Sequence, residues 1–221
     1  MKTLQVKKIV LFIFLGLLFS GTAFAQKDKK AKEILDKSSE TFSQAGGVKA
    51  GFTINMKDIK DKVTESFDGT ILMKGDKFYL TTPDFDLWFN GTVQWFYMKR
   101  NEEVTVSEPT KEELQMLNPA VLLNIYKLGF NYKYIGEKTD IKGRPVHELH
   151  LIPQKKTDVQ KMIIQIGKFS NLPHTITIEN KNDIHNIIHI NQYETKQNYT
   201  DSRFSFDSKK FPDVEVIDLR D

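Results

Sequence analysis

Residues 65–107 read ESFDGTILMKGDKFYLTTPDFDLWFNGTVQWFYMKRNEEVTVS. Short runs rich in β-branched and aromatic residues alternate here with turn dipeptides such as Gly75-Asp76, Pro83-Asp84 and Asn90-Gly91. This spacing predicts consecutive antiparallel strands joined by hairpins, at 65–73, 77–82, 87–90, 92–98 and 103–107. Asn90-Gly91 predicts a type I′ turn, which needs positive φ at both central residues.

The same strand pattern continues on both sides of this stretch. One strand is expected before it, at 52–56, and five after it, at 131–137, 146–152, 162–167, 174–179 and 186–194. From residue 27 to residue 45 the apolar residues instead recur with a helical period, at Ala31, Leu35 and Phe42 among others, and Gly46-Gly47 ends the pattern. We therefore expect one amphipathic helix followed by a long run of strands.

Two short helices are expected to interrupt the strands, at 111–117 and 119–128. Thr110 and Glu113 have the spacing of a capping box, and Asn118-Pro119 places a good N-cap before a proline. Gly129 is expected to close the second helix in a left-handed conformation.

This order of elements predicts an α+β fold that is mainly antiparallel β. A sheet of ten or so twisted strands tends to curl, which gives it a concave face. Strand alternation places Trp95 on the same side as Tyr97, Ile164 on the same side as Met162 and Ile166, and Ile176 on the same side as Ile178. One face of the sheet is therefore expected to be apolar. The helices would cover that face; an ordinary closed core is the alternative.

The first 25 residues have the three parts of a secretory signal peptide. Residues 1–8 are basic, residues 9–19 are apolar, and Ala23-Phe24-Ala25 is a small-x-small cleavage site. Because the apolar run is too short to span a bilayer, an uncleaved anchor is the weaker alternative. We expect a single mature domain, residues 26–221, in the periplasm, without lipid of its own because the chain has no Cys.

Composition and spacing argue against several classes of function. The lysines of the leader account for the whole net charge of +3, so no basic face for nucleic acid is expected. His185 and His189 lie too far apart on one strand to share an ion, and His147 and His150 point to opposite faces. No G-x-S-x-G motif is present. We expect no metal, no cofactor and no enzymatic activity; a hydrolase with an unrecognised site is the least favoured alternative.

Several segments in order resemble the periplasmic outer-membrane lipoprotein carrier family, LolA, from about Lys30 to Asp218. The matching segments are the Gly-led strand from Gly69 to Phe78, the Asn90-Gly91 turn before Trp95-Phe96-Tyr97, Glu103-Val104, the helix at 118–123, Leu149 with Pro153, Phe204 with Phe206, and Pro212-Asp213-Val214.

The resemblance implies an incomplete, half-open β-barrel with an α-helical lid over an apolar concave face. It implies a monomeric carrier that takes lipoproteins by their acyl chains from an inner-membrane release complex to an outer-membrane acceptor. A binding module for another lipid or glycolipid on the same fold is the alternative. Phe78 matches a cavity aromatic of the family, and strand alternation and the apolar clusters extend the expected lipid-binding cavity. Its residues are Leu72, Phe78, Leu80, Trp95, Tyr97, Leu117, Leu122, Ile125, Ile164 and Ile176.

The chain departs from the family pattern after the second strand. The family commonly has Arg-Pro after the Lys of this strand, and that Arg is implicated in cargo handling and in holding the lid. Here the chain reads Lys74-Gly75-Asp76-Lys77. Either Lys74 or Lys77 takes the role of the Arg, or the lid is held differently.

Overall fold

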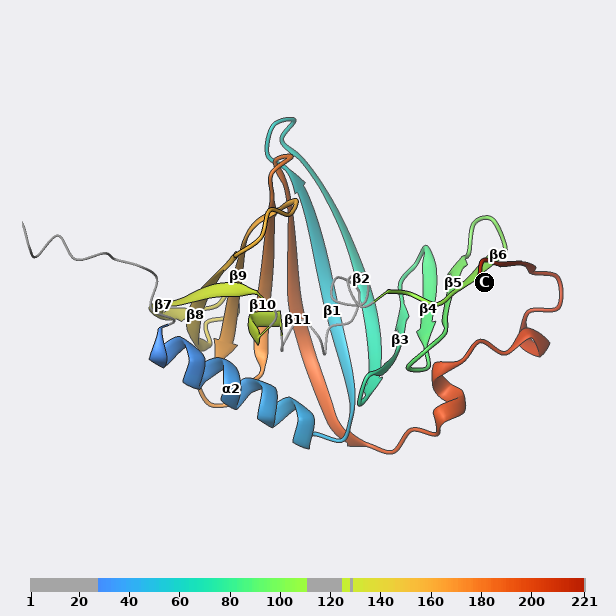
Figure 1. Cartoon of the computed structure of the whole chain (residues 1–221), viewed down its shortest axis with the longest axis horizontal. Helices are drawn as coiled ribbons and strands as arrows, with labels where there is room; N and C mark the ends of the chain where they lie inside the picture. The colour runs from blue at the N-terminus through green and yellow to red at the C-terminus, as the bar shows by residue number, and fades with distance from the viewer. Residues whose placement is uncertain (1–27, 111–124, 128, 221) are drawn as a thin grey trace, which may run out of the picture.

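The computed structural model describes residues 28–110, 125–127 and 129–220, which form one long helix, twelve strands and three short 3₁₀ helices. In chain order (Figure 1) these are α2 (Lys29–Gln44), β1 (Gly47–Asp58), β2 (Val63–Lys74), β3 (Lys77–Thr81), β4 (Phe85–Phe89), β5 (Gln94–Met98), β6 (Glu103–Ser107), η1 (Ile125–Lys127), β7 (Phe130–Thr139), β8 (Pro145–Pro153), β9 (Val159–Gly167), β10 (Pro173–Asn180), β11 (Ile184–Gln197), η2 (Asp201–Phe204), η3 (Ser208–Lys210) and β12 (Glu215–Asp218).

All twelve strands belong to one sheet, which is not closed. Its order is β12-β6-β5-β4-β3-β2-β1-β11-β10-β9-β8-β7, so β12 and β7 are the edges. Each neighbouring pair is antiparallel except β12, which runs parallel to β6. The two long central strands, β1 and β11, join the two halves of the meander through pairs such as Phe52 with Ile190 and Ile54 with Ile188.

One face of the sheet, here called the inner face, carries the core. The register continues this face across the central strands, from Leu80 through Ile71 and Ala50 to Tyr193, and from Ile188 through Ile176 and Ile164 to Leu149. Because alternate residues point to the same face, these apolar side chains form two neighbouring buried clusters. One cluster lies on β7 to β10 and the other on β1 to β4.

Helix α2 packs on the inner face. Its N-cap residue Asp28 accepts hydrogen bonds from Ala31 N (3.1 Å) and from Tyr134 N on the edge strand β7 (2.9 Å). Ala31 and Leu35 are buried in the cluster on β7 to β10. The helix ends before Gly46, whose φ of +69° lets the chain turn into β1. In Figure 1, α2 crosses one end of the strands from β7 towards β1.

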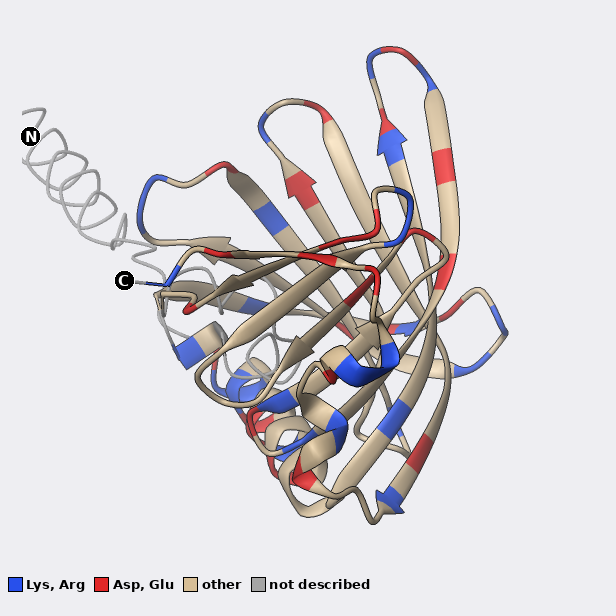
Figure 2. Ribbon diagram, turned by 90° about the vertical axis from the view of Figure 1, so that its right-hand side faces the viewer, with Lys and Arg blue, Asp and Glu red and all other residues tan. Residues whose placement is uncertain are grey.

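The opposite, outer face is covered near β3 to β6 by residues 198–218, here called the C-terminal segment. Trp88 contacts Phe206 and Phe211, and Tyr97 contacts Phe211, with ring centroids 5.1–6.1 Å apart. The segment ends in β12 against β6. This half of the sheet is therefore apolar on both faces, and the C-terminal segment covers the outer one. In Figure 2, Lys and Arg are interspersed with Asp and Glu around the hairpin ends.

The predicted elements are confirmed wherever the structure describes them, with three differences. The first predicted helix corresponds to α2, and the eleven predicted strands correspond to β1 to β11. The short strand β12 and the 3₁₀ helices η2 and η3 were missed. The two short helices predicted at 111–117 and 119–128 lie mostly outside the described residues, which show only η1, at the end of the second. Finally, the type I′ turn was wrong. Gly91 has positive φ but Asn90 does not, and Asn90 Oδ1 instead accepts hydrogen bonds from Thr92 N and Val93 N.

Candidate functional site

A cavity of about 290 Å³ lies on the inner face between the two halves of the sheet. It is lined by side chains from the end of α2, from β1 to β5 and from β10 and β11. The lining residues are Phe42, Ala50, Phe52, Ile54, Ile71, Met73, Leu80, Phe85, Leu87, Gln94, Phe96, Pro173, Ile176, Ile188, Ile190 and Tyr193.

Among the described residues, the cavity wall is apolar apart from two polar side chains. Tyr193 donates its hydroxyl hydrogen to the Pro173 carbonyl (2.9 Å), and burial raises the pKa of this phenol above its usual range. Gln94 Oε1 is buried and has no hydrogen-bond partner among the described residues. No charged side chain of the described chain lines the cavity. Because an unpaired charge is costly in such surroundings, this wall suits an apolar ligand.

Gly69 is needed where the wall is built from Phe52. Gly69 faces Phe52 in the β1–β2 register, and a Cβ at Gly69 would lie 2.3 Å from the Phe52 ring. The ring therefore lies directly over the glycine, where any other side chain would displace it. In the sequence, Gly69 stands out only as the first residue of the Gly-led strand that resembles the LolA family. Its contact with Phe52 could be recognised only in the structure.

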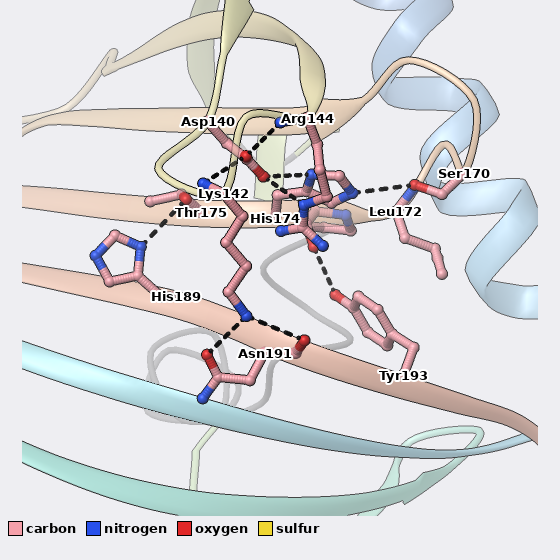
Figure 3. Close-up of polar contacts among 11 residues, drawn as sticks. Asp140, Lys142, Arg144, Ser170, Leu172, His174, Thr175, His189, Asn191 and Tyr193 are labelled. Carbon is pink, nitrogen blue, oxygen red and sulfur yellow. Dashed lines mark hydrogen bonds and ion pairs between the residues drawn. The ribbon is translucent and has the colours of Figure 1, made fainter.

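A polar network supports the turns next to this wall (Figure 3). The Asp140 carboxylate accepts hydrogen bonds from Lys142 N and Arg144 N (both 2.9 Å), from Arg144 Nε (2.7 Å) and from His174 Nδ1 (2.9 Å). Burial alone raises the pKa of Asp140, but the hydrogen bonds from Arg144, Lys142 and His174 outweigh it and lower this pKa to about 2. Burial also lowers the pKa of His174. His174 adjoins Pro173, so the network holds one end of the cavity wall.

Four of the predicted cavity residues lie on the inner face. Leu80 and Ile176 line the cavity. Phe78 is fully buried beside it, with its ring centroid 5.5 Å from that of Phe89. Ile164 belongs to the cluster beneath α2. That these residues contact lipid remains a prediction.

Three predicted cavity residues lie on the outer face instead: Leu72, Trp95 and Tyr97. Their assignment to the cavity was wrong. On β5 it is Gln94 and Phe96 that line the cavity, so Trp95 and Tyr97 alternate to the other side. Leu72 faces outward in register with Tyr79. The outer face is apolar as well, because it packs against the C-terminal segment. Hydrophobicity alone could therefore not distinguish the two faces.

The other three predicted residues fall at the edge of what the structure describes. Leu117 and Leu122 lie outside the described residues, and Ile125 begins η1. The neighbouring Tyr126, also in η1, is buried in the cluster beneath α2. Several wall residues were missed, including Phe42, Ile54 and Ile188. The strand register from Ile176 leads across the sheet to Ile188 and then to Ile54.

Lys74 and Lys77 are turned away from the cavity. Both bind Asp201 of the C-terminal segment, at 3.0 and 2.7 Å, and Lys74 Nζ also donates to the Tyr199 carbonyl (2.8 Å). The hypothesis that either lysine takes the role of the family Arg at the lid is therefore not supported by their positions. They anchor the C-terminal segment instead.

Within the described ranges, no group of three or more His, Cys, Asp or Glu side chains is arranged to hold a metal ion. No helix in the part of the chain that the structure describes is long and apolar enough to cross a membrane.

Residues 21–182 match the sequence profile described as outer membrane lipoprotein carrier protein LolA. This chain belongs to the LolA family. The recognition of the family from its motifs is thereby confirmed, and with it the open, mainly antiparallel LolA-like sheet.

Other relatives of this LolA family member are distant. It is similar to an uncharacterized protein of Methanocaldococcus jannaschii, with 28% identity over 179 residues, which are 78% of this chain and 52% of the relative. The chain thus spans about half the length of this relative. A crystal structure of an uncharacterized conserved protein from Thermus thermophilus has the same fold, with a TM-score of 0.60 and 12% identity over 86% of this chain and 99% of the other. A LolA superfamily protein from Nitrosomonas europaea was also found, with a TM-score of 0.46 and 11% identity over 80% and 97% of the two chains.

Proposed function

We propose that this protein binds the acyl chains of lipoproteins in the inner-face cavity and carries them through the periplasm to the outer membrane. The observation that carries the proposal is the cavity itself, an apolar space with no charged lining residue among those described. Each CH₂ group of an acyl chain gains about 0.8 kcal/mol when it leaves water, so such a wall can hold a lipid without any directional bond.

Under this proposal the cargo comes from an inner-membrane release complex and passes to an outer-membrane acceptor. Residues 1–25 act as a cleaved signal peptide, and the mature monomer begins at Gln26. N-terminal sequencing of the periplasmic protein tests this part; an uncut leader would contradict it. The family membership supports a carrier role. The apolar wall supports a ligand whose part inside the cavity is uncharged.

The direct test is to purify the protein from the periplasm of its own cells and identify bound molecules by mass spectrometry. Lipoproteins or acylated peptides are expected. A free lipid or glycolipid in their place would favour the alternative binding module, and the absence of any acylated species would contradict both.

A matched pair of variants locates the binding site. Leu80→Phe places a larger side chain in the cavity wall, and a fluorescent long-chain fatty acid should then bind about tenfold more weakly, because the ring occupies space that the chain needs. Ile152→Phe is the control, since Ile152 is half exposed on β8 and does not line the cavity. Equal affinities for the two variants, with both folded by circular dichroism, would place the site elsewhere.

A further inference from the structure

Ile141 and Phe169 are the two most exposed large apolar side chains of the described chain, at 72% and 83%. They lie on different turns. Ile141 is in the turn between β7 and β8, and Phe169 is in the turn between β9 and β10. Because β8 pairs with β9, and Val146 faces Gly167 at the end of both strands, the two turns are neighbours at one end of the sheet. Exposure of this size in two adjacent turns calls for a partner.

The two turns are joined by hydrogen bonds. Lys168 N donates to the Pro145 carbonyl (3.0 Å), which joins the turns through their backbones. The His174 ring joins them through side chains, with Nδ1 on Asp140 (2.9 Å) and Nε2 on Ser170 (3.3 Å), as Figure 3 shows. Ser170 Oγ also accepts from Leu172 N (3.3 Å), within the second turn. Fixed turns hold their exposed side chains in place before any partner arrives, which lowers the entropy lost on binding.

Glycine makes this close approach of the turns possible. A Cβ at Gly167 would lie 2.3 Å from Ser170 Oγ and 2.4 Å from His174 Nε2. A larger residue would therefore separate the serine from the histidine that links the turns. Neither Ser170 nor His174 lines the cavity, although His174 adjoins the wall residue Pro173, so the same network supports both the turns and one end of the wall.

The charges around the two side chains are mainly positive. Lys138, Lys142 and Lys168 are exposed, and Arg144 is partly exposed. The acidic residues nearby are Glu137, at the end of β7, which pairs with Lys168 (2.8 Å), and Asp140 in the turn, whose side chain is only 1% exposed and pairs with Arg144. Two apolar side chains on convex turns with cations beside them have the chemistry of an interfacial anchor on an anionic bilayer.

The β1–β2 hairpin, which also exposes apolar residues, differs in this respect. Ile59 and Val63, at 49% and 52% exposed, flank the β1–β2 turn, where Asp58 and Asp61 accompany Lys60 and Lys62. These four formal charges cancel, so this turn has no excess of positive charge that would attract an anionic surface. The turns of Ile141 and Phe169 instead combine higher exposure with an excess of positive charge.

We propose that Ile141 and Phe169 form a membrane-docking tip that inserts reversibly into the headgroup region of an anionic lipid bilayer, with the surrounding lysines at the lipid phosphates. The tip would bring the protein to the membrane surface on which its ligand is exchanged. The proposal rests on these turns alone and holds whether or not the cavity carries lipoproteins.

Vesicle sedimentation tests the docking tip with the protein recovered from the periplasm. The probes are vesicles of phosphatidylcholine alone and vesicles containing one part in three phosphatidylglycerol. Binding is expected only to the anionic vesicles and should fall in about 0.5 M salt, which screens the lysines. Ile141→Ser/Phe169→Ser should weaken it about tenfold or more. The matched control, Ile59→Ser/Val63→Ser, should bind like the natural protein.

A gain of signal provides the second measurement. Phe169→Trp should show a blue shift of tryptophan emission on addition of anionic vesicles, as the indole enters the interface, and no shift with phosphatidylcholine. No binding to anionic vesicles, or equal loss in both double variants, would overturn the proposal. The proposal would also be overturned if the natural protein did not bind vesicles but associated with a membrane protein through Phe169. That result would indicate a protein-docking surface.

Discussion

Asp140→Asn should destabilise the protein in a way that depends on pH. The Asp140 side chain is 1% exposed and accepts four hydrogen bonds, from Lys142 N, Arg144 N, Arg144 Nε and His174 Nδ1. These bonds favour the carboxylate over the neutral acid. They lower the pKa of Asp140 from its usual 3.8 to about 2, despite the opposing effect of burial.

The magnitude follows from linkage between protonation and folding. At 1.36 kcal/mol per pKa unit, the ionised Asp140 contributes about 2 kcal/mol to the free energy of unfolding at neutral pH. Because the folded-state pKa is the lower one, this contribution is fully present above pH 3.8 and is lost as the pH falls towards 2. About 1 kcal/mol of it should already be gone at pH 3. Asparagine keeps the shape of the side chain but cannot follow this titration.

Denaturant unfolding at pH 7 and at pH 3 measures the difference between the natural protein and Asp140→Asn. The difference should be about 2 kcal/mol at pH 7 and about half that at pH 3. Asp61→Asn, at an exposed position in the β1–β2 turn, is the control and should change the free energy by less than about 0.5 kcal/mol at both pH values. A difference at pH 7 no larger than that of the control, or one that stays constant with pH, would refute the reasoning.

Three further variants test the cavity wall and its surroundings. Gly69→Ala should lower the free energy of unfolding by about 1–3 kcal/mol, because the added Cβ would lie 2.3 Å from the Phe52 ring. Gly51→Ala is the control and should cost less, since its Cβ would have its nearest contact at 3.5 Å. Equal losses for the two variants would show that the Phe52 ring moves freely. Gln94→Met should raise the free energy of unfolding by about 1 kcal/mol, since it removes a buried oxygen that has no partner among the described residues; a lower value would mean that the amide is bonded in solution. Phe78→Ala should cost about 3–5 kcal/mol in thermal or denaturant unfolding because the ring is fully buried, and a loss below 1 kcal/mol would place Phe78 in an open wall rather than a packed core.

The sequence by itself determined the order and type of the elements. Turn dipeptides and period-two alternation are local signals, so β1 to β11 could be placed from Gly75-Asp76, Asn90-Gly91 and similar pairs. The helical period did the same for α2. The strand β12 escaped because Glu215–Asp218 is short and pairs with β6, which lies far away in the sequence. The order of local motifs was also enough to recognise the family.

Only the tertiary structure decided which face of each strand the cavity uses. Alternation shows that Trp95 and Tyr97 share a side, but not which side faces the cavity, because that depends on what covers each face. Here the C-terminal segment brings Phe206 and Phe211 against the outer face, so aromatic residues are favoured on both sides of β4 and β5. Contacts between residues distant in the sequence also set the roles of Gly69, which lies beneath Phe52, and of His174, which joins two turns. Local sequence fixes the direction in which side chains alternate, while long-range packing decides what each of them meets.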